Sequence, residues 1–543
     1  MNVGTARDVL LLLMPDYLAP DMHVWQRFPP LGPAVVAACV TNAHTCVHAV
    51  DLLLDQDTLA RDADARDAFG NGGRVAAWLQ GRPDDGLESL LERTLACVGD
   101  ARLKAADVIA ISVDRGSQGA FALALAHLLK RRYEAAVVLG GVATQVLRGH
   151  LDALGVQGPD VLTRASTPDE IERVFDVAFS LPRGRRGPAL EPVDGPVALV
   201  RGGRRAARGA EGWPAPDFSI YDLARYRRDA FAPQLNADVP YQGQLGPTLM
   251  LPYHFAFECQ FSCAFCQNGG SQSHKPVDLV VRELADMAER WGTTQFAFFN
   301  AQSNLIAPAL SRALLDAKVS LQWSDSYRVR PCEPGDLELM ARAGCVSLTV
   351  GVESASDRVL KAMVKGHRGE HATALVREAS TLEILLRVNL LSGFPGETRE
   401  DFDLTCAWIE EHAPLIDDIA PSSYYLTADS PVGRAPERFG IRVRGPRGLI
   451  GANKFRKVYD ALAYDEVDGM TWEEREPLLD ESEDLLRAAW MRGRGEFANL
   501  PPIPPALMLA LRARFARRRD ALRAMRGWID PRRAAHDGAV DAG

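Results

Sequence analysis

The stretch from Glu258 to Gly270 reads ECQFSCAFCQNGG and places three of the chain's nine cysteines within eight residues. These cysteines are Cys259, Cys263 and Cys266, with the spacing C-x3-C-x2-C. Three thiolates so close together can bind one metal centre if the backbone loops around it. A structural zinc site normally has four protein ligands, and His254 or His274 could supply the fourth. An iron–sulfur cube held by three cysteines would instead leave one iron open.

The sequence around the cysteines alternates between strand and helix patterns. An apolar run, GPTLMLPYHF, precedes the cysteines, and the helical pattern VDLVVRELADMAERW follows them. Further strands are predicted at 295–300, 320–327, 345–354, 385–394 and 422–427. About six β/α units between residues 246 and 445 predict a partial (β/α)6 barrel, with its active site at the carboxyl ends of the strands. Residues 446–543 are predicted to form a C-terminal helical region.

Residues 1–185 show a second alternation of strands and helices. The runs DVLLLLMP, TCVHAVDLLL, DVIAISVD and AAVVLGG have strand length, and helical patterns separate them. This α/β pattern predicts a doubly wound, Rossmann-like domain with a parallel sheet. Its ligand edge should include Asp16, residues 112–117 and residues 140–144. Residues 186–245 are rich in Gly, Pro and Arg and are predicted to be a linker.

Composition excludes some classes of partner. A net charge of -9 in 543 residues argues against general nucleic-acid binding, which needs clustered Lys and Arg. No apolar run approaches the roughly 20 residues that span a bilayer, so we expect no membrane partner and a cytoplasmic protein. A small-molecule or peptide substrate is the better expectation.

The cysteine motif resembles that of the radical S-adenosylmethionine (SAM) superfamily. The hallmark of this family is C-x3-C-x-aromatic-C, which Cys259, Cys263, Phe265 and Cys266 match. The resemblance implies a [4Fe-4S] cluster bound by the three cysteines, with SAM chelated to the open iron. It also implies an external electron donor of the flavodoxin or ferredoxin type, and cleavage of SAM to a 5'-deoxyadenosyl radical.

Later segments extend this resemblance to residue 441. They read AGCVSLTVGVESASDRVLKAMVKG, LLSGFPGETREDF and YYLTADSPVGRAPERFGI. The resemblance implies a SAM site made by Phe265, Asn300, Gln302, Arg328, Glu353, Ser354 and Gly393. Local roles remain open beside these: Ser354 could cap the following helix, Arg328 could form a surface salt bridge, and Gly393 and Gly396 could be turn glycines.

A doubly wound domain ahead of such a barrel resembles the cobalamin-binding subclass, which includes radical SAM methyltransferases. This resemblance implies a cobalamin site at Ser112, Ser117, Gly140, Gly141 and Thr144. It implies methylation of an unactivated carbon or phosphorus of a specialised metabolite or peptide. The chain departs from the subclass at one motif: Asp21 and His23 match D-x-H-x-x-G, but Gln26 replaces the glycine.

Two alternatives stay open at this point. One is a radical SAM enzyme that catalyses cyclisation, oxidation or rearrangement without methyl transfer. The other is a zinc-stabilised binding protein. We also expect the helical tail after about residue 450 to cover or shape the barrel opening.

Overall fold

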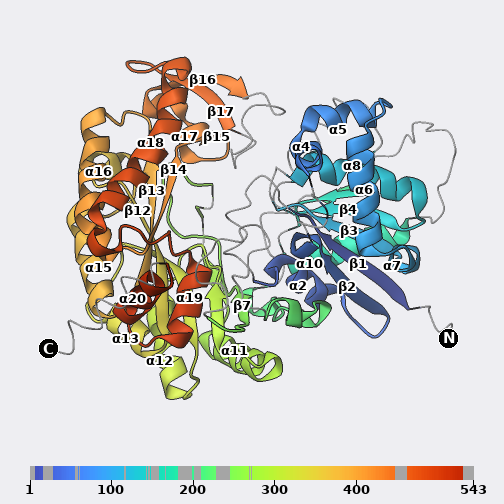
Figure 1. The fold of residues 1–543 in the computed structure, drawn as a ribbon, viewed down its shortest axis with the longest axis horizontal. Coiled ribbons are helices and arrows are strands. Elements are labelled where there is room, and N and C mark those ends of the chain that lie inside the picture. Colours follow the sequence, from blue (N-terminus) through green and yellow to red (C-terminus); the bar gives the residue numbers. More distant parts are fainter. Residues whose placement is uncertain are drawn as a thin grey trace. The chain divides into compact units, whose positions relative to one another are not determined.

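The computed structural model describes most of the chain in two compact units (Figure 1). The described residues are 6–15, 28–55, 59, 62–114, 118–141, 144, 147, 158–165, 167–181, 198–200, 209–227, 245–267, 269–270, 272–446 and 461–529. Unit 1 comprises Met1–His23, Pro29–Arg225 and Gly448–Asp460. Unit 2 comprises Val24–Phe28, Tyr226–Arg447 and Ala461–Gly543.

Unit 1 contains a parallel sheet with the strand order β2-β1-β3-β4-β5-β6. The strands are β1 (Arg7–Leu13), β2 (Thr45–Asp51), β3 (Val108–Ser112), β4 (Ala136–Gly140), β5 (Val161–Thr163) and β6 (Ala198–Val200). The strand order changes direction between β1 and β3, which is where doubly wound sheets bind their ligands. The predicted doubly wound fold is confirmed.

Both faces of this sheet are buried because β1 is apolar at every position from Val9 to Leu13. Leu10 and Leu12 belong to one core cluster, and Val9 and Leu11 belong to another. The first cluster includes residues of α4 (Ala63–Gly70), α5 (Gly72–Leu79), α6 (Asp85–Val98), α7 (Asp100–Ala105) and α8 (Gly119–Arg132). The second includes residues of α2 (Leu31–Val40) and α10 (Pro168–Ser180). Each fully buried Leu or Val contributes about 1.5–3 kcal/mol.

Part of the stretch predicted as a linker packs on unit 1. Strand β6 extends the sheet beside β5. Further on, Asp217 N donates to Ala34 O at 3.0 Å, and the Tyr221 hydroxyl donates to Pro30 O at 2.8 Å. An ion pair of 2.7 Å joins Arg225 to Asp55. These contacts fix residues 209–225 against α2 and the short 3-10 helix at Leu52–Asp55.

Unit 2 contains a second parallel sheet, with the order β7-β10-β11-β12-β13-β14. Its strands are β7 (Met250–Tyr253), β10 (Gln295–Phe298), β11 (Gln322–Arg328), β12 (Cys345–Glu353), β13 (Leu385–Ser392) and β14 (Asp418–Ser423). The connecting helices are α11 (Val277–Trp291), α12 (Ala307–Asp316), α13 (Asp336–Arg342), α14 (Asp357–Ala362), α15 (Gly369–Thr381) and α16 (Arg399–His412). This confirms the predicted partial barrel. The sixth strand begins at Asp418, earlier than the sequence indicated.

The C-terminal part is less helical than predicted. Strands β15 (Leu426–Thr427), β16 (Ile441–Pro446) and β17 (Ala461–Glu466) form a small antiparallel sheet in the order β15-β17-β16. Strand β17 lies inside the stretch expected to be helical. It forms a strand because it pairs with two neighbours and buries Tyr464 in an apolar cluster. Between β15 and β16 lies the short helix α17 (Pro431–Arg434).

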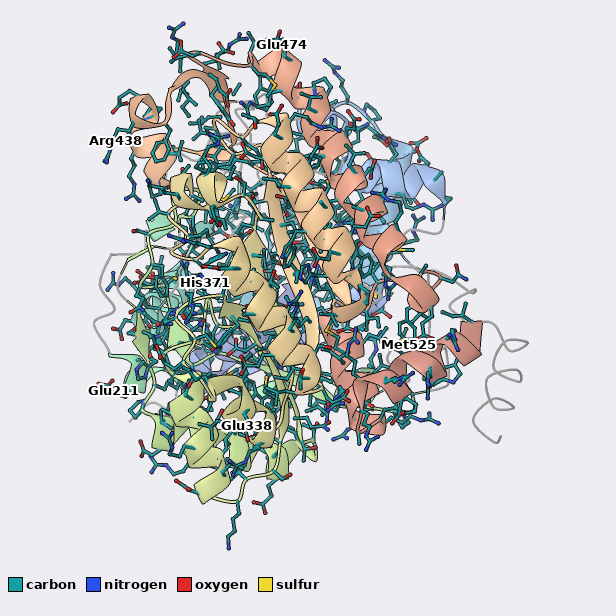
Figure 2. All side chains as sticks on the ribbon, turned by 90° about the vertical axis from the view of Figure 1, so that its left-hand side faces the viewer. Glu211, Glu338, His371, Arg438, Glu474 and Met525 are labelled. Carbon is teal, nitrogen blue, oxygen red and sulfur yellow. The ribbon has the colours of Figure 1, made fainter. Side chains whose placement is uncertain are left out.

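The last helices do not all lie at the barrel opening. Helix α18 (Trp472–Gly493) runs beside α16, and Figure 2 shows the two helices side by side. Helices α19 (Pro505–Arg514) and α20 (Arg518–Ile529) pack at the amino end of the barrel. Gln322, the first residue of β11, donates to Arg512 O at 3.0 Å, and the Ser347 hydroxyl donates to Met508 Sδ at 2.9 Å. Two of the predicted tail helices therefore close the end opposite the expected active site.

Among the described residues, we find no helix with the length and apolarity needed to cross a bilayer.

Candidate functional site

The three cysteines lie in a loop that follows the carboxyl end of β7. Two short antiparallel strands, β8 (Ala256–Phe257) and β9 (Ser273–His274), enclose the loop. The loop also closes on itself, because Gly270 N donates to Cys259 O at 2.8 Å. Cys263 is buried, and Cys259 and Cys266 are half-buried. All nine cysteines lie in the described part of the chain, and none forms a disulfide.

Asn300 holds the start of the loop. Its side-chain oxygen accepts hydrogen bonds from Phe255 N at 3.2 Å and Ala256 N at 3.0 Å. Its amide nitrogen donates to Asp325 Oδ2 at 2.8 Å. Burial raises the pKa of Asp325 to about 8, although hydrogen bonds from Asn300 and Ser326 oppose the rise. The polar atoms of Asn300, which the sequence assigned to SAM, therefore contact the protein itself.

Gln302, the next predicted SAM residue, is also engaged within the protein. It is buried, and its side-chain nitrogen donates to Gln272 Oε1 at 2.6 Å. Its side-chain oxygen accepts from Asn304 N at 3.1 Å. Since Gln272 follows the cysteine loop, Gln302 holds the end of the loop much as Asn300 holds the beginning.

Two later segments hold the middle of the loop through backbone hydrogen bonds. Ala264 N donates to Met363 O at 2.9 Å, at the end of α14. Ala264 O accepts from Val432 N at 3.2 Å, in α17. Cys266 N also donates to Cys263 O at 3.0 Å, which makes a turn between these two cysteines. The backbone around the thiols is thus fixed by contacts that are distant in sequence.

Arg328, at the end of β11, reaches a cysteine of the motif. Its Nη1 lies 2.9 Å from Cys263 Sγ, and its guanidinium lies over the Phe261 ring, 3.9 Å from the ring centroid. Its Nε donates to Arg330 O at 3.2 Å, and its Nη2 donates to Lys365 O. The side chain is buried, so Arg328 does not form the surface salt bridge that the sequence left open.

Glu353, the last residue of β12, forms a buried ion pair that the sequence did not indicate. Its Oε1 lies 3.1 Å from Lys365 Nζ. The Lys365 ammonium also lies 5.7 Å from the centroid of the Phe265 ring. Glu353 has a φ of 67°, in a region that residues with side chains rarely adopt, beside a register shift between Gly351 and Glu353. Such strain is concentrated at functional sites.

His367 lies near Lys365 and Arg328, the two cations beside the cysteine loop. Burial, together with the nearby charges of Lys365 and Arg328, lowers the pKa of His367 to about 3. The imidazole is therefore neutral at pH 7. The run KAMVKGHR could have indicated these residues, because it places basic groups at the end of the helix that follows the predicted strand.

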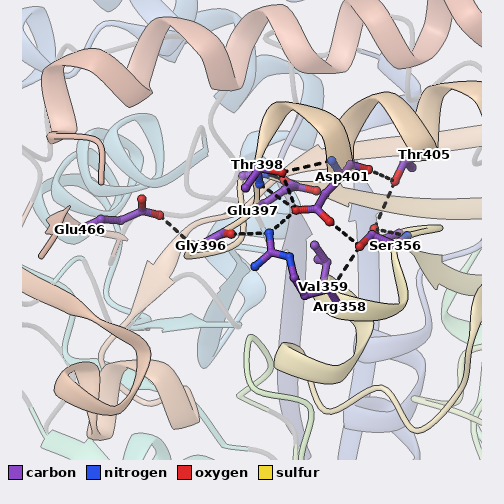
Figure 3. A network of polar contacts seen from close by, with 11 residues as sticks. Ser356, Arg358, Val359, Gly396, Glu397, Thr398, Asp401, Thr405 and Glu466 are labelled. Carbon is purple, nitrogen blue, oxygen red and sulfur yellow. Dashed lines mark hydrogen bonds and ion pairs between the residues drawn. The ribbon is translucent and has the colours of Figure 1, made fainter. Parts of the chain in front are cut away.

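A polar network joins the end of β12 to α16, and Figure 3 shows its members Ser356, Asp401 and Thr405. Ser354 belongs to this network. Its hydroxyl lies 3.1 Å from Thr405 Oγ1, and it accepts from Ser356 N at 3.1 Å. Ser356, not Ser354, caps α14. Ser356 also donates to Asp401 Oδ1 at 2.6 Å, and Arg358 pairs with the same carboxylate. Ser354 is fully buried and fixes the strand end that carries Glu353.

The glycine turn after β13 is held by charged side chains. Gly393 N donates to the Glu397 carboxylate, and Arg475 Nη1 donates to Gly393 O at 2.9 Å. Gly396 N donates to Glu466 Oε1 at 2.8 Å. Both glycines have a positive φ, 75° and 78°, so the turn itself requires them. Burial raises the pKa of Glu397 to about 7.

Four of the five residues predicted to bind cobalamin lie at or just after the carboxyl ends of β3 and β4 in unit 1, namely Ser112, Gly140, Gly141 and Thr144. Ser112 donates to Asp114 Oδ1 at 3.2 Å. Thr144 is buried and donates to Gly141 O at 2.8 Å and to Thr163 O at 2.7 Å. The sequence did not single out Gln118, which links this edge to β1 by donating to Met14 O at 3.0 Å. Ser117, Asp16, Asp21, His23 and Gln26 lie outside the described residues.

The two histidines considered as zinc ligands contact the backbone. His254 Nε2 lies 2.9 Å from Ala256 O, and His274 Nδ1 lies 2.9 Å from Lys275 O. Burial lowers the pKa of His254 to about 4. Within the described ranges, no group of three or more His, Cys, Asp or Glu side chains is placed to hold a single metal ion.

Comparison with known proteins identifies the barrel. Residues 253–409 match the radical SAM superfamily. The chain contains a radical SAM domain. For this domain, the match confirms the family expected from the cysteine motif, and a radical SAM domain implies a [4Fe-4S] cluster and SAM as cofactors. The match favours an iron–sulfur cluster over the alternative of a zinc-stabilised binding protein.

Curated relatives match this domain. A tRNA-2-methylthio-N(6)-dimethylallyladenosine synthase from Ruegeria sp. (strain TM1040) is 26% identical over 246 residues, 42% of this chain and 53% of that protein. A bacteriochlorophyllide d C-12(1)-methyltransferase from Chlorobaculum tepidum is 27% identical over 163 residues, 28% of this chain and 36% of that protein. The chain therefore spans about half or less of the length of these relatives.

Solved structures match both units. The radical SAM methyltransferase TsrM from Kitasatospora setae, with cobalamin and a [4Fe-4S] cluster bound, gives a TM-score of 0.56 at 16% identity. That match covers 96% of this chain and 99% of TsrM. The cobalamin-dependent radical SAM enzyme OxsB gives a TM-score of 0.53 at 11% identity, covering 99% of this chain and 81% of OxsB. The chain shares the fold of these enzymes.

Proposed function

We propose that this chain is a cobalamin-dependent radical SAM methyltransferase that methylates an unactivated carbon or phosphorus of a specialised metabolite or peptide. One observation carries the proposal. A radical SAM barrel with its cysteine loop after β7 is preceded by a doubly wound sheet of order 2-1-3-4-5-6, and nearly the whole chain matches TsrM.

The cysteine loop suits a cluster. Three cysteines that form no disulfide lie in one loop, and the loop is fixed at its start, middle and end. The Arg328 guanidinium beside Cys263 can balance part of the thiolate charge. We assign Cys259, Cys263 and Cys266 as the cluster ligands. A bound cluster supplies the electron for reductive cleavage of SAM.

Glu353 is the best candidate for contact with SAM. Its carboxylate is positioned at the end of a barrel strand, where barrel enzymes place their catalytic groups. It can accept hydrogen bonds from the SAM ammonium while Lys365 holds its other side. Phe265, half-buried between two of the cysteines, can form an apolar wall for adenine. Asn300, Gln302 and Ser354 position the backbone around this site.

We assign the edge formed by Ser112, Gly140, Gly141 and Thr144 to cobalamin. The edge lies next to the reversal of strand order between β1 and β3. Gly140 and Gly141 are half-buried at this edge, so part of their surface is open to a ligand. Bound cobalamin would carry the methyl group.

Product analysis tests the proposal. Anaerobically reconstituted protein with SAM, cobalamin, a flavodoxin- or ferredoxin-type reductant and a candidate substrate should yield 5'-deoxyadenosine together with S-adenosylhomocysteine. If 5'-deoxyadenosine forms in both the presence and absence of cobalamin, without S-adenosylhomocysteine, the protein catalyses a radical reaction without methyl transfer.

Two cysteine variants separate cluster loss from general damage. Cys263→Ala should lose bound iron and both SAM products. Cys46→Ala, which changes an exposed cysteine of β2 in unit 1, should retain both. Full iron in Cys263→Ala would contradict the assignment of the cluster to this loop.

A further inference from the structure

Arg328 uses each of its three guanidinium nitrogens within the protein. Nη1 contacts Cys263 Sγ, Nη2 contacts Lys365 O and Nε contacts Arg330 O. The planar group is also stacked on Phe261. With 7% of its surface exposed, the residue has little freedom to turn toward a ligand. A role in binding the SAM carboxylate would require these contacts to break.

The contact with Cys263 has an electrostatic consequence. Iron–sulfur reduction potentials depend on net charge and on hydrogen bonds to the sulfurs. Reduction adds one negative charge, and a cation 2.9 Å from a ligand sulfur favours the more negative state. The effect is large where water is excluded, and both Arg328 and Cys263 are buried.

We propose that Arg328 raises the reduction potential of the cluster by donating an N–H to Cys263 Sγ. This role rests on the proposed function insofar as the loop must hold a cluster. The step it assists is the transfer of one electron from a flavodoxin- or ferredoxin-type donor to the cluster. No bond forms or breaks, and the guanidinium keeps its charge throughout. Arg328 is a positioning residue that acts through Cys263.

The other contacts of Arg328 explain how the guanidinium is kept in place. Lys365 O and Arg330 O fix the direction of its other two nitrogens, and Phe261 covers one face. A lysine at this position would keep the charge but lack the planar fork that meets three acceptors at once. The structure therefore predicts that the charge of residue 328 and the shape of its side chain each affect the reduction potential of the cluster.

The test measures the midpoint potential of the reconstituted cluster in a redox titration that is monitored by electron paramagnetic resonance. In Arg328→Gln, the ratio of reduced to oxidised cluster at a fixed potential should fall at least tenfold, which corresponds to a midpoint lower by at least about 59 mV for a one-electron couple. Arg328→Lys should lie between this variant and the unchanged protein. Arg330→Gln is the matched control, because its exposed side chain does not contact the loop cysteines, and its midpoint should not move.

Iron content decides how each result is interpreted. If the unchanged protein binds no iron–sulfur cluster, the proposed function fails, whatever Arg328 does. If Arg328→Gln binds four irons and keeps the original midpoint, only the role of Arg328 is refuted.

A second measurement needs no variant. Protein labelled with ¹⁵N in its arginine side chains should show a ¹⁵N hyperfine coupling to the reduced cluster. Its absence would overturn the proposal even if Arg328→Gln failed to fold.

Discussion

Replacing Gly141 by alanine should destabilise unit 1, whereas the same change at Gly140 should not. Gly141 follows β4 with a φ of 121°. A Cβ placed there would lie 2.4 Å from Val113 O and 2.8 Å from its carbonyl carbon. At Gly140 the nearest atom to an added Cβ is Thr163 Cγ2 at 3.5 Å, an ordinary contact. The two glycines are adjacent, so Gly140→Ala is a close control for Gly141→Ala.

The expected magnitude follows from the backbone. An unfavourable φ costs about 1–3 kcal/mol. The overlap with Val113 adds to this cost, because a backbone carbonyl cannot rotate away as a side chain can. We therefore expect a loss of at least about 2 kcal/mol, which corresponds to about a 30-fold change in an equilibrium constant.

Hydrogen exchange measured by mass spectrometry can test this in the full chain. Peptides that cover β3 and β4 should exchange about 30-fold faster in Gly141→Ala, if exchange occurs through opening of unit 1. The same peptides should be nearly unchanged in Gly140→Ala. Equal protection in the two variants would refute the reasoning about Val113. Faster exchange in unit 2 peptides as well would show that the effect is not local.

Three further predictions concern unit 2. Leu509→Ala in α19 should lower the free energy of unfolding by about 2–5 kcal/mol in urea titrations, whereas Leu404→Ala, at an exposed position, should change it by less than about 0.5 kcal/mol. Burial raises the pKa of Glu397 from 4.5 to about 7 in the folded protein. The free energy of unfolding should therefore fall as the pH rises between these values, by up to about 1.4 kcal/mol per pH unit, and Glu397→Gln should remove this slope. Burial opposes ionisation of Asp401, but hydrogen bonds from Arg358, Ser356 and Thr398 hold its pKa well below the usual range. Stability should therefore fall as the pH drops below about 4, and Asp401→Asn should weaken that acid dependence.

The sequence predicted the strands that are buried on both faces. Runs such as DVLLLLMP have strand length and no polar interruption, so their assignment did not depend on their neighbours. The helix at residues 277–291 was predicted with the bounds that α11 has, because its apolar positions repeat at helical spacing. Strands β6 and β17 were missed. Strand β6 has only three residues and pairs with β5, and β17 becomes a strand by pairing with β15 and β16.

The candidate site was harder to predict because its polar atoms serve the fold. Family motifs placed Ser354 near SAM, but the choice between Ser354 and Ser356 as the helix cap depends on where β12 ends. The register shift before Glu353 decides that point. Likewise, no sequence pattern reveals that Arg328 contacts Cys263, because the contact depends on how β11 lies against the loop.

The cysteine loop owes its conformation to the rest of the barrel. Asn300 holds its start, Met363 and Val432 hold Ala264, and Gln302 contacts the residue that follows the loop. These partners come from three separate parts of the barrel, namely the connection from β10 to α12, the end of α14, and α17. The thiols therefore reach their places only after several β/α units have assembled. A residue that holds the cysteine loop in this way can therefore be essential for activity without contacting SAM. Loss of activity alone would not distinguish such a residue from a ligand, whereas iron content and the midpoint potential would.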